Sequence, residues 1–286
     1  MTITITTSNV NGIRAAKRKG IEQWAAKNTP DVWCMQEVRA PQNEIDPIFD
    51  EFGFEYATAG RIADQSGLDR MNEICRIKGR AGVGLLSALP VIDKRYGLPG
   101  LAEDVDSGRW IEADVKTPQG YTVTVVCVYV HAGNTDDPEK MKQKYRFLDT
   151  MLVRMGQLRD EAAHGGKQAV LCGDFNIAHT PLDIKNAKAN EKHAGFLSEE
   201  RAYVDKWLGE LEFVDVMRSL CGDIQGPYTW WSQRGRAFDN NVVWSIDYQF
   251  ATPELAETDR GFVIDKAPTY DLRWSDHAPL SITYDV

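Results

Sequence analysis

Apolar residues are concentrated in short runs that recur along the whole chain, and polar residues separate these runs. Short runs rich in Val, Ile and Thr that end at Gly, Pro or Asp are typical of β-strands. The runs that predict strands are Thr2–Ser8, Val32–Met35, Gly82–Ser87, Trp110–Val115, Thr122–Tyr129, Ala169–Cys172, Val242–Phe250 and Leu280–Tyr284.

Helical spacing is found between some of these runs. Between Met141 and Leu158, large apolar residues recur every three or four positions, so one face of a helix should pack on a sheet. Ser198 is followed by acidic residues, which is typical of a helix N-terminus. The predicted helices lie around Gly20–Lys27, Pro47–Phe52, Pro138–Glu161 and Ser198–Glu210.

Several predicted strands follow one another without a helix between them, which favours mixed sheets over a purely parallel sheet. The 286 residues contain no fixed-period repeat, no low-complexity tract and no Pro/Gly/Ser-rich linker. We therefore predict a single domain over residues 1–286, with an α/β fold in which two sheets pack together and helices cover them.

Charge and cysteine content narrow the class of protein. The net charge is −9, which argues against a protein that simply coats nucleic acid, although a metal-dependent nuclease also needs clustered carboxylates. The five cysteines include no C-x-x-C pair and favour small buried hydrophobic residues over a disulfide framework. The N-terminus lacks the pattern of a secretory signal, and no segment approaches the ~20 apolar residues that span a bilayer. These features predict a reducing, cytoplasmic setting and no membrane contact.

Polar side chains stand where the predicted strands end, and ends of strands are common places for ligand and catalytic sites. Taken singly, most of them would be turn residues that bond their own backbone. Asp247 is different, because it lies in an apolar run and a buried carboxylate needs a partner. The polar residues at strand ends are Asn9, Glu37, Tyr129, Asp174, Asn176, Asp247, Asp276 and His277.

The chemical character of this set indicates one reaction class. Carboxylate and amide oxygens suit Mg²⁺ or Mn²⁺, and Zn²⁺ is the alternative because His277 is present. A metal, a carboxylate and a hydrogen-bonding residue together meet the needs of phosphodiester hydrolysis. The sequence contains neither a G-x-S-x-G element nor a P-loop, so serine-esterase and nucleotide-triphosphatase chemistry are unsupported.

Seven motifs, in order along the chain, resemble those of the exonuclease III branch of the endonuclease/exonuclease/phosphatase superfamily. GDFN and SDHAP are typical of the superfamily, whereas NEKHAGFLSEER and YTWW resemble its DNA-repair members. The motifs are SNVNGIR (Ser8–Arg14), MQEV (Met35–Val38), GDFN (Gly173–Asn176), NEKHAGFLSEER (Asn190–Arg201), YTWW (Tyr228–Trp231), WSIDY (Trp244–Tyr248) and SDHAP (Ser275–Pro279).

The resemblance implies a four-layer α/β sandwich of two facing mixed β-sheets flanked by helices. It also implies a Mg²⁺-dependent DNA-repair phosphodiesterase of the exodeoxyribonuclease III type, acting as a monomer in the cytoplasm, at the nucleoid. Such an enzyme hydrolyses the phosphodiester 5′ to abasic sites, trims blocked 3′ ends and degrades duplex DNA 3′→5′. Two alternatives stay open: a relative that hydrolyses a phospholipid or phosphoinositide, and a catalytically silent DNA-binding member.

Carried over position by position, the resemblance implies roles for the site residues. Glu37 would be a principal Mg²⁺ ligand, with Asn9, Asp174, Asn176, Asp276 and His277 completing or bordering the metal site. Asp174 would orient or deprotonate the attacking water, and Asn176 would hold the phosphate. His277 would touch the scissile phosphate and Asp247 would orient His277. Tyr129 would lie beside the phosphate or the leaving oxygen.

The resemblance also implies a pocket for an abasic sugar, formed by Trp230, Trp244 and Ile246. Trp244 and Ile246 are two residues apart in one predicted strand, so their side chains should share a face. Three positions depart from the family pattern: His131 replaces a proline, Ser245 stands where many members carry Arg, and Trp274 precedes SDH. Apart from the resemblance, local clusters of basic residues on this acidic chain are candidate contacts for the DNA backbone, although each cluster alone is more often a solvated face. The candidates are Arg14, Lys17, Arg76, Lys78 and Arg80.

Overall fold

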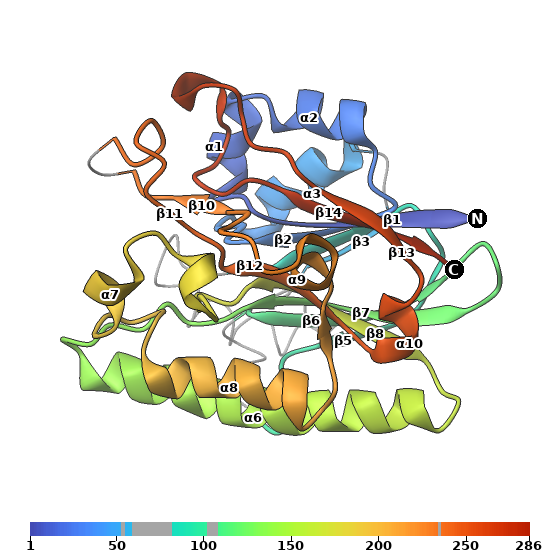
Figure 1. The fold of residues 1–286 in the computed structure, drawn as a ribbon. Helices are drawn as coiled ribbons and strands as arrows, with labels where there is room; N and C mark the ends of the chain where they lie inside the picture. Colours follow the sequence, from blue (N-terminus) through green and yellow to red (C-terminus); the bar gives the residue numbers. More distant parts are fainter. Residues whose placement is uncertain (53–54, 59–81, 102–107, 234–235) are drawn as a thin grey trace.

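The structure is a computed structural model, which describes residues 1–52, 55–58, 82–101, 108–233 and 236–286. Its centre is a pair of six-stranded mixed sheets that face each other (Figure 1). The first sheet has the strand order β13-β14-β1-β2-β4-β3. Its strands are β1 (Thr2–Asn9), β2 (Val32–Gln36), β3 (Glu55–Thr58), β4 (Gly84–Ser87), β13 (Asp259–Ile264) and β14 (Leu280–Asp285).

The second sheet has the order β5-β6-β7-β8-β12-β9, and a separate two-stranded ribbon pairs β10 with β11. The strands of the second sheet are β5 (Val91–Tyr96), β6 (Trp110–Lys116), β7 (Thr122–Tyr129), β8 (Gln168–Asp174), β9 (Val214–Asp215) and β12 (Asp247–Ala251). The ribbon consists of β10 (Trp230–Trp231) and β11 (Val243–Trp244).

Helices form the two outer layers. The first sheet is covered by α1 (Ile13–Arg18), α2 (Ile21–Asn28) and α3 (Gln42–Asp50), and the second by α6 (Pro138–Ala163) and α8 (Ser198–Gly209) (Figure 1). The helix α6 begins at a capped N-terminus, where the Asp137 side chain accepts from the backbone N–H of Lys140. The shorter helices are α7 (Ala187–Asn190), α9 (Val216–Cys221) and α10 (Pro253–Ala256), with 3₁₀ turns at Pro181–Asp183 and Tyr270–Leu272.

The alternation of side chains along β7 shows how the layers are joined. Val125 and Cys127 point into the core between the two sheets, whereas Val126 and Val128 point into the core between the second sheet and α6. A third core lies between the first sheet and α1–α3 and contains Trp33 and Phe49. Three buried layers between four structural layers confirm the predicted α/β sandwich.

Strand register brings the polar strand ends together. The strands β1 and β2 run parallel, with Asn9 opposite Gln36, and β7 and β8 run parallel, with Tyr129 opposite Asp174. The strand β12 is antiparallel to β8 and begins at Asp247, directly opposite Asp174. All of these ends therefore lie at the side of the molecule where β10 and β11 are found, away from the chain termini (Figure 1).

Two predicted elements were wrong. The run Val242–Phe250 is not one strand: β11 ends at Trp244, β12 starts at Asp247, and the N–H of Ser245 between them donates to the carbonyl of Asp183 (2.7 Å) instead of to a neighbouring strand. The helix predicted at Pro47–Phe52 begins earlier, since α3 spans Gln42–Asp50 and Pro47 lies inside it. Within the part of the chain that the structure describes, no helix is long and apolar enough to cross a membrane.

Candidate active site

A histidine between two aspartates forms the centre of the site. The Nδ1 of His277 lies 2.9 Å from Oδ2 of Asp247, and its Nε2 lies 3.8 Å from Oδ2 of Asp174. All three side chains are buried. The backbone N–H of Asp247 donates to the hydroxyl of Thr229 (3.2 Å), which fixes the start of β12. The bond to Asp247 orients the imidazole so that Nε2 faces Asp174.

Burial and the charges of neighbouring side chains together set the pKa values of Asp174 and His277. Burial raises the pKa of Asp174 to about 7; the positive His277 opposes this rise and the charge of Asp247 adds to it. Burial alone would lower the pKa of His277, but the carboxylate of Asp247 outweighs it and raises that pKa to about 9. At neutral pH, His277 therefore carries a proton while Asp174 is close to its own titration point.

Two asparagines hold Asp174. The Nδ2 of Asn9 donates to Oδ2 of Asp174 (2.9 Å), and the backbone N–H of Asn176 donates to Oδ1 (2.9 Å). The side-chain amide of Asn176 is in turn fixed by a bond to the carbonyl of Val130 (3.0 Å). Asp174 is therefore fixed in position through both of its oxygens.

A second group of polar side chains, centred on the carboxylate of Glu37, lines the same cavity. The phenol of Tyr129 donates to Oε1 of Glu37 (2.6 Å), and the guanidinium of Arg39 pairs with Oε2. Arg39 also donates to Oδ1 of Asn11 (2.8 Å), whose amide donates to Asp276 (2.7 Å). A chain of polar contacts thus joins Glu37 to Asp276 through Arg39 and Asn11. Arg39 and Asn11 were not among the predicted residues of the metal and catalytic site.

The ionisation of these groups follows from their surroundings. Burial, with a contribution from Asp174, raises the pKa of Tyr129 to about 12, so its phenol stays protonated. Burial would raise the pKa of Asp276, but the His277 charge and the Asn11 amide outweigh it and hold that pKa below its usual value. Asp276 is therefore an anion near neutral pH.

Trp230, Trp244 and Ile246 line one cavity together with the polar residues. The cavity has a volume of about 360 Å³. The rings of Trp230 and Trp244 meet edge to face, with centroids 6.1 Å apart, and Trp230 also lies 6.4 Å from the His277 ring. Ile246 lines the cavity although the strand is interrupted before it. Its backbone is fixed there because its N–H donates to the hydroxyl of Thr229 and its carbonyl accepts from the N–H of Phe175.

The structure shows where the three departures from the family pattern lie. Ser245 is fully buried and does not line the cavity. The ring of His131 packs against Phe147, with centroids 5.6 Å apart, and burial lowers its pKa to about 3, so it is neutral. Trp274 packs against Trp24 in the core under α2, and so closes the hydrophobic layer beneath the SDH motif. None of the three lines the cavity.

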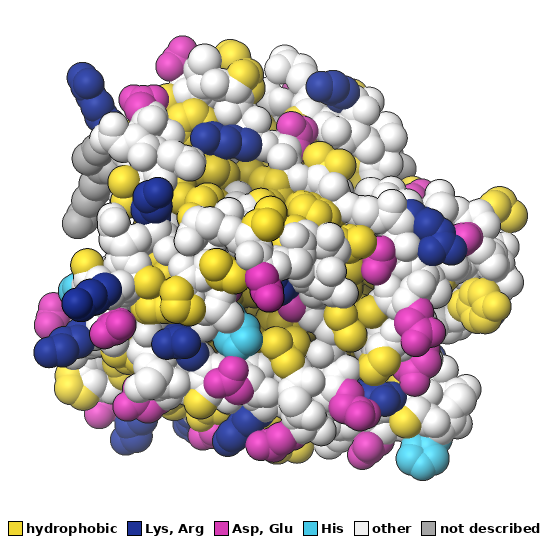
Figure 2. All heavy atoms as spheres, viewed as in Figure 1, with side chains coloured by type: hydrophobic (Ala, Val, Ile, Leu, Met, Phe, Trp, Pro, Cys, Tyr) yellow, Lys and Arg dark blue, Asp and Glu magenta, His cyan; other side chains and the backbone are white. Residues whose placement is uncertain are grey.

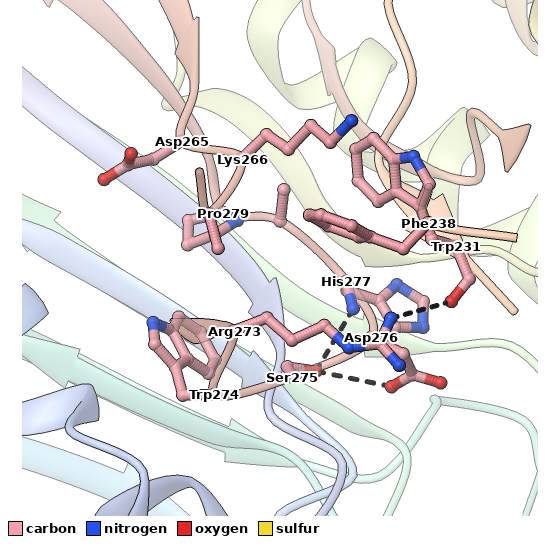
Figure 3. A pocket seen from close by; sticks show the side chains of 12 residues that line it. Trp231, Phe238, Asp265, Lys266, Arg273, Trp274, Ser275, Asp276, His277 and Pro279 are labelled. Atoms are coloured by element: carbon pink, nitrogen blue, oxygen red, sulfur yellow. Dashed lines mark hydrogen bonds between the residues drawn. The ribbon is translucent and has the colours of Figure 1, made fainter. Parts of the chain in front are cut away.

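The outer side of the SDH motif is a rim of aromatic and cationic side chains. Figure 3 shows Trp231, Phe238, Lys266 and Arg273 around His277 and Asp276. The ammonium of Lys266 lies 4.9 Å from the centroid of the Trp231 ring, and the guanidinium of Arg273 donates to the carbonyl of Trp231 (3.3 Å). This rim holds β10 against the loop that carries His277.

The residues around Glu37 and Asp174 fit a hard divalent cation. Carboxylates of Glu37, Asp174 and Asp276 and the amide of Asn176 line one cavity, and Asn9 contacts Asp174 from beneath. These are oxygen donors of the kind that Mg²⁺ and Mn²⁺ prefer. Among the described residues, Asp174, Asp247 and His277 also bring ligand atoms within 4.8 Å of one another. Asp247 already orients His277, so the oxygens around Glu37 are a second group that could hold a cation.

The predicted DNA-backbone residues are only partly described. Arg14 lines an open groove with Arg18 and Arg39, and its guanidinium pairs with Glu44 (2.8 Å). Lys17 pairs with Glu51 (2.7 Å), so its charge is partly balanced. On the face in Figure 2, Lys and Arg are interspersed with Asp and Glu and form no single basic patch. Arg76, Lys78 and Arg80 lie outside the described residues.

Comparison with known proteins agrees with this geometry. The sequence profile of the Endonuclease/Exonuclease/phosphatase family matches residues 6–277. An exodeoxyribonuclease of Bacillus subtilis (strain 168) is 28% identical over 279 residues, which cover 97% of this chain and 98% of that protein. A DNA-(apurinic or apyrimidinic site) endonuclease of Dictyostelium discoideum is 29% identical over 278 residues, covering 97% of this chain and 69% of that protein.

Solved structures show the same fold. The structure of an AP endonuclease from Archaeoglobus fulgidus superimposes with a TM-score of 0.82 and 30% identity, covering 99% of this chain and 100% of that one. A 3′ phosphatase, NExo from Neisseria, bound to a product DNA hairpin, gives a TM-score of 0.81 and 26% identity with the same coverage. The chain therefore belongs to the endonuclease/exonuclease/phosphatase family, in the branch that contains exodeoxyribonucleases and AP endonucleases.

Proposed function

We propose that this DNA-repair nuclease is a Mg²⁺-dependent phosphodiesterase, also served by Mn²⁺, that incises duplex DNA 5′ to abasic sites. Trimming of blocked 3′ ends and 3′→5′ degradation of duplex DNA use the same site. The observation that carries the proposal is the line Asp247–His277–Asp174, which lies beside a cavity walled by Trp230 and Trp244. The printed activities of the related proteins, exodeoxyribonuclease, AP endonuclease and 3′ phosphatase, support it.

Each polar residue of the site can serve a step of the hydrolysis. Asp174, held by two asparagines, orients the attacking water and accepts its proton. His277, kept protonated by Asp247, donates from Nε2 to a phosphate oxygen. The amide of Asn176 holds the phosphate, and the protonated Tyr129 lies beside it or beside the leaving oxygen.

Glu37 would be the principal residue that holds the cation, with Asn9, Asp174, Asn176, Asp276 and His277 completing or bordering its site. When bound, Mg²⁺ neutralises phosphate charge and stabilises the leaving alkoxide. The pairing of Glu37 with both Tyr129 and Arg39 keeps this carboxylate in place at the cavity edge.

Selectivity for abasic sites follows from the apolar wall. A nucleotide without its base leaves the duplex at low cost, because little stacking or pairing is lost. A cavity walled by Trp230, Trp244 and Ile246 can accept a bare sugar and exclude a base. One chain supplies the proposed base, the phosphate donor, the cation ligands and the pocket wall, so the reaction needs no residue from a second copy, and we also propose that the protein acts as a monomer.

One experiment tests the metal, the lesion and the substrate class together. Labelled duplexes with one abasic analogue, with no lesion or with a 3′-phosphate at a nick are incubated beside phosphoinositide vesicles, with Mg²⁺ or with excess chelator. We expect Mg²⁺-dependent incision of the abasic strand, faster than cleavage of the intact duplex, and no lipid hydrolysis. Full activity in chelator would refute the metal assignment, lipid hydrolysis would favour the lipid alternative, and inactivity on every substrate would favour the silent one.

A further inference from the structure

A buried lysine lies beneath the candidate site. Lys144, in the second turn of α6, has a fully buried side chain. Its Nζ lies 2.5 Å from Oε1 of Glu200 and donates to the carbonyls of Asn176 (2.9 Å) and Ala132 (3.3 Å). The ammonium therefore joins the loop that follows β7, the loop that follows β8 and the helix α8.

Glu200 extends the same connection to a third loop. Its other oxygen, Oε2, accepts from the backbone N–H groups of Gly195 (2.6 Å) and Leu197 (3.0 Å). Both Glu200 and Gly195 belong to the NEKHAGFLSEER motif, whose role the proposed chemistry leaves unexplained.

Gly195 lines the cavity beside Trp244. Its φ is +94°, and a Cβ there would come within 2.8 Å of the Trp244 ring and 3.2 Å of the Asn176 carbonyl. Its own carbonyl accepts from the N–H of Ala178 (2.8 Å). The segment that Glu200 holds is thus packed against both Trp244 and the backbone of Asn176.

Stability alone does not account for such a pair. The cost of removing two charges from water often equals or exceeds their mutual attraction, and apolar residues of similar size are commonly as stable. What apolar residues lack is the ability to bond backbone carbonyl and N–H groups of several loops at once. Each loop bonded here lies at the candidate site: Ala132 follows Tyr129, Asn176 follows Asp174, and Gly195 lies beside Trp244.

We propose that the Lys144–Glu200 pair is a positioning device that sets Asn176 against the phosphate and sets the Trp244 wall of the pocket. The inference rests on the proposed function, because it assigns both residues to the geometry of that reaction. Lys144 and Glu200 act through other residues and touch no reacting atom. Without the pair, the loops can fold but their spacing relaxes, and displacements of about 1 Å can slow a reaction about 100-fold.

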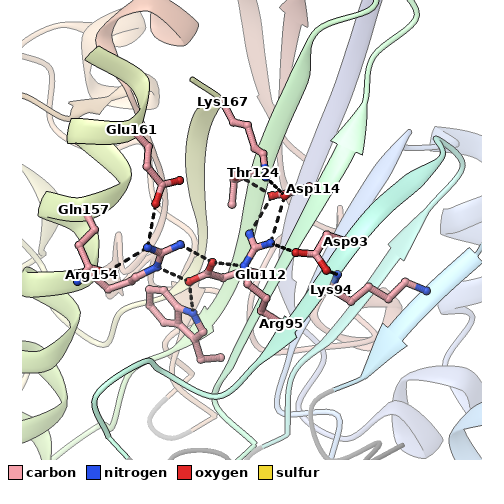
Figure 4. Close-up of polar contacts among 11 residues, drawn as sticks. Asp93, Lys94, Arg95, Glu112, Asp114, Thr124, Arg154, Gln157, Glu161 and Lys167 are labelled. Carbon is pink, nitrogen blue, oxygen red and sulfur yellow. Dashed lines mark hydrogen bonds and ion pairs between the residues drawn. The ribbon is translucent and has the colours of Figure 1, made fainter. Parts of the chain in front are cut away.

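The helix α6 provides a matched control. Arg154 lies ten residues after Lys144 on the same helix and also makes a buried ion pair, with Glu112 at 2.7 Å. That pair joins α6 to β6 and contacts none of the site loops (Figure 4). Arg154→Met should therefore lower the melting temperature and leave the rate of the folded protein unchanged.

The test measures kcat, KM and melting temperature for Lys144→Met, for the double variant Lys144→Met/Glu200→Gln and for Arg154→Met, with the abasic duplex and Mg²⁺. We expect Lys144→Met to lower kcat about 10- to 100-fold per folded molecule, with little change in KM. The double variant should regain melting temperature, because no unpaired charge stays buried. Its kcat should stay low, because the Asn176 and Ala132 carbonyls have still lost their donor.

Two results would overturn the inference while leaving the proposed function intact. One is an unchanged kcat in folded Lys144→Met, and the other is recovery of kcat together with melting temperature in the double variant. Failure of the wild-type protein on the abasic duplex would instead refute the proposed function itself, and with it this positioning role.

Discussion

Several residues of the site adopt the left-handed backbone conformation, with positive φ, which residues other than glycine rarely take. Asn11, Glu37, Arg39 and Asn176 have φ values of 45°, 54°, 52° and 50°. Such conformations cost of order 1–3 kcal/mol each and persist where surrounding contacts enforce them. Here, the carbonyl of Glu37 accepts from the N–H of Gly12 (2.8 Å), so the two strained turns hold each other. Backbone strain of this kind is typical of sites whose geometry serves a function.

At this scale, the first prediction concerns the carboxylate of Asp174. Asp174→Asn keeps the shape and a hydrogen-bond acceptor but removes the charge, so folding should be nearly intact. We expect kcat to fall by ~10²–10⁴-fold, the usual contribution of a general base. Steady-state rates on the abasic duplex measure this, with Asp136→Asn in an exposed turn as the control. A variant that kept more than about a tenth of the wild-type rate would contradict the assignment.

The acidities of Asp174 and His277 predict a pH profile. If Asp174 is the base, as proposed, its pKa of about 7 means that the rate should rise with pH up to about 7. If His277 is the proton donor, its pKa of about 9 means that the rate should fall above about 9. Asp247→Asn removes the charge that raises the pKa of His277, so the alkaline fall should move to lower pH. An alkaline limb that stays in place in this variant would argue against the role of His277.

At the scale of elements, the sequence pattern predicted the buried strands best. β7 and β8 are enclosed on both faces, and their near-continuous apolar runs are easily recognised. The edge strands β3, β5 and β13 were not predicted, because edge strands carry polar residues and show a weak apolar pattern: β5 includes Asp93, Lys94 and Arg95. The break between β11 and β12 depends on Thr229 and Asp183, distant residues that no local pattern identifies.

The candidate site was predictable to a similar extent. That Asn9, Asp174 and His277 would meet followed from their places at strand ends and from the resemblance. The roles of Asn11 and Arg39 depend on left-handed turns and on contacts between loops. Lys144 has the sequence signature of an ordinary helix residue, and only the fold shows that it is buried beside Asn176. Long-range packing, unlike strand position, leaves little trace in a single sequence.

The ribbon β10–β11 gives a prediction at the element scale, because it carries both tryptophans of the pocket. If the pocket selects abasic sugars, Trp244→Ala should enlarge it and raise cleavage of intact duplex relative to abasic duplex. If Trp244 is only a packing residue, the change should cost ~3–5 kcal/mol of stability and lower all activities together. Cleavage ratios measured beside a melting curve separate the two, and an unchanged ratio with a collapsed melting temperature would refute the pocket.

For the short helix α1, the prediction concerns DNA-backbone contacts by Arg14 and Lys17. If they bind phosphates, Arg14→Ala and Lys17→Ala should each weaken binding evenly across DNA sequences and flatten its salt dependence by ~0.9 in log–log slope. Arg260→Ala serves as the control, since Arg260 pairs with Asp285 near the C-terminus. Binding measured as a function of salt concentration decides it, and an unaltered slope would make both residues ordinary solvated charges.

At the scale of the whole molecule, a network of buried charges lies apart from the candidate site, on the second sheet (Figure 4). In this network, Arg95 of β5 bonds Glu112 and Asp114 of β6 (2.8 Å each), and Arg154 of α6 bonds Glu112. Lys167, just before β8, pairs with Asp114. The network joins the edge strand β5 to the covering helix, so it should contribute to stability and not to catalysis.

This network predicts how stability depends on acidity. Burial would raise the pKa of Asp114, but the hydrogen bonds from Arg95 and Lys167 outweigh it and lower the pKa to about 2. In the unfolded chain, an aspartate titrates near 3.9. The stabilisation is therefore fully present above about pH 5 and is lost as the pH falls towards 2, and its size is about 2–3 kcal/mol.

Asp114→Asn lacks this pH-dependent stabilisation, so the difference in unfolding free energy between wild type and variant should shrink on acidification below about pH 5. Urea unfolding between neutral and acidic pH measures the difference, with the exposed Asp223→Asn as control. A difference that stayed constant over that range would show that the Asp114 ion pairs do not stabilise the fold.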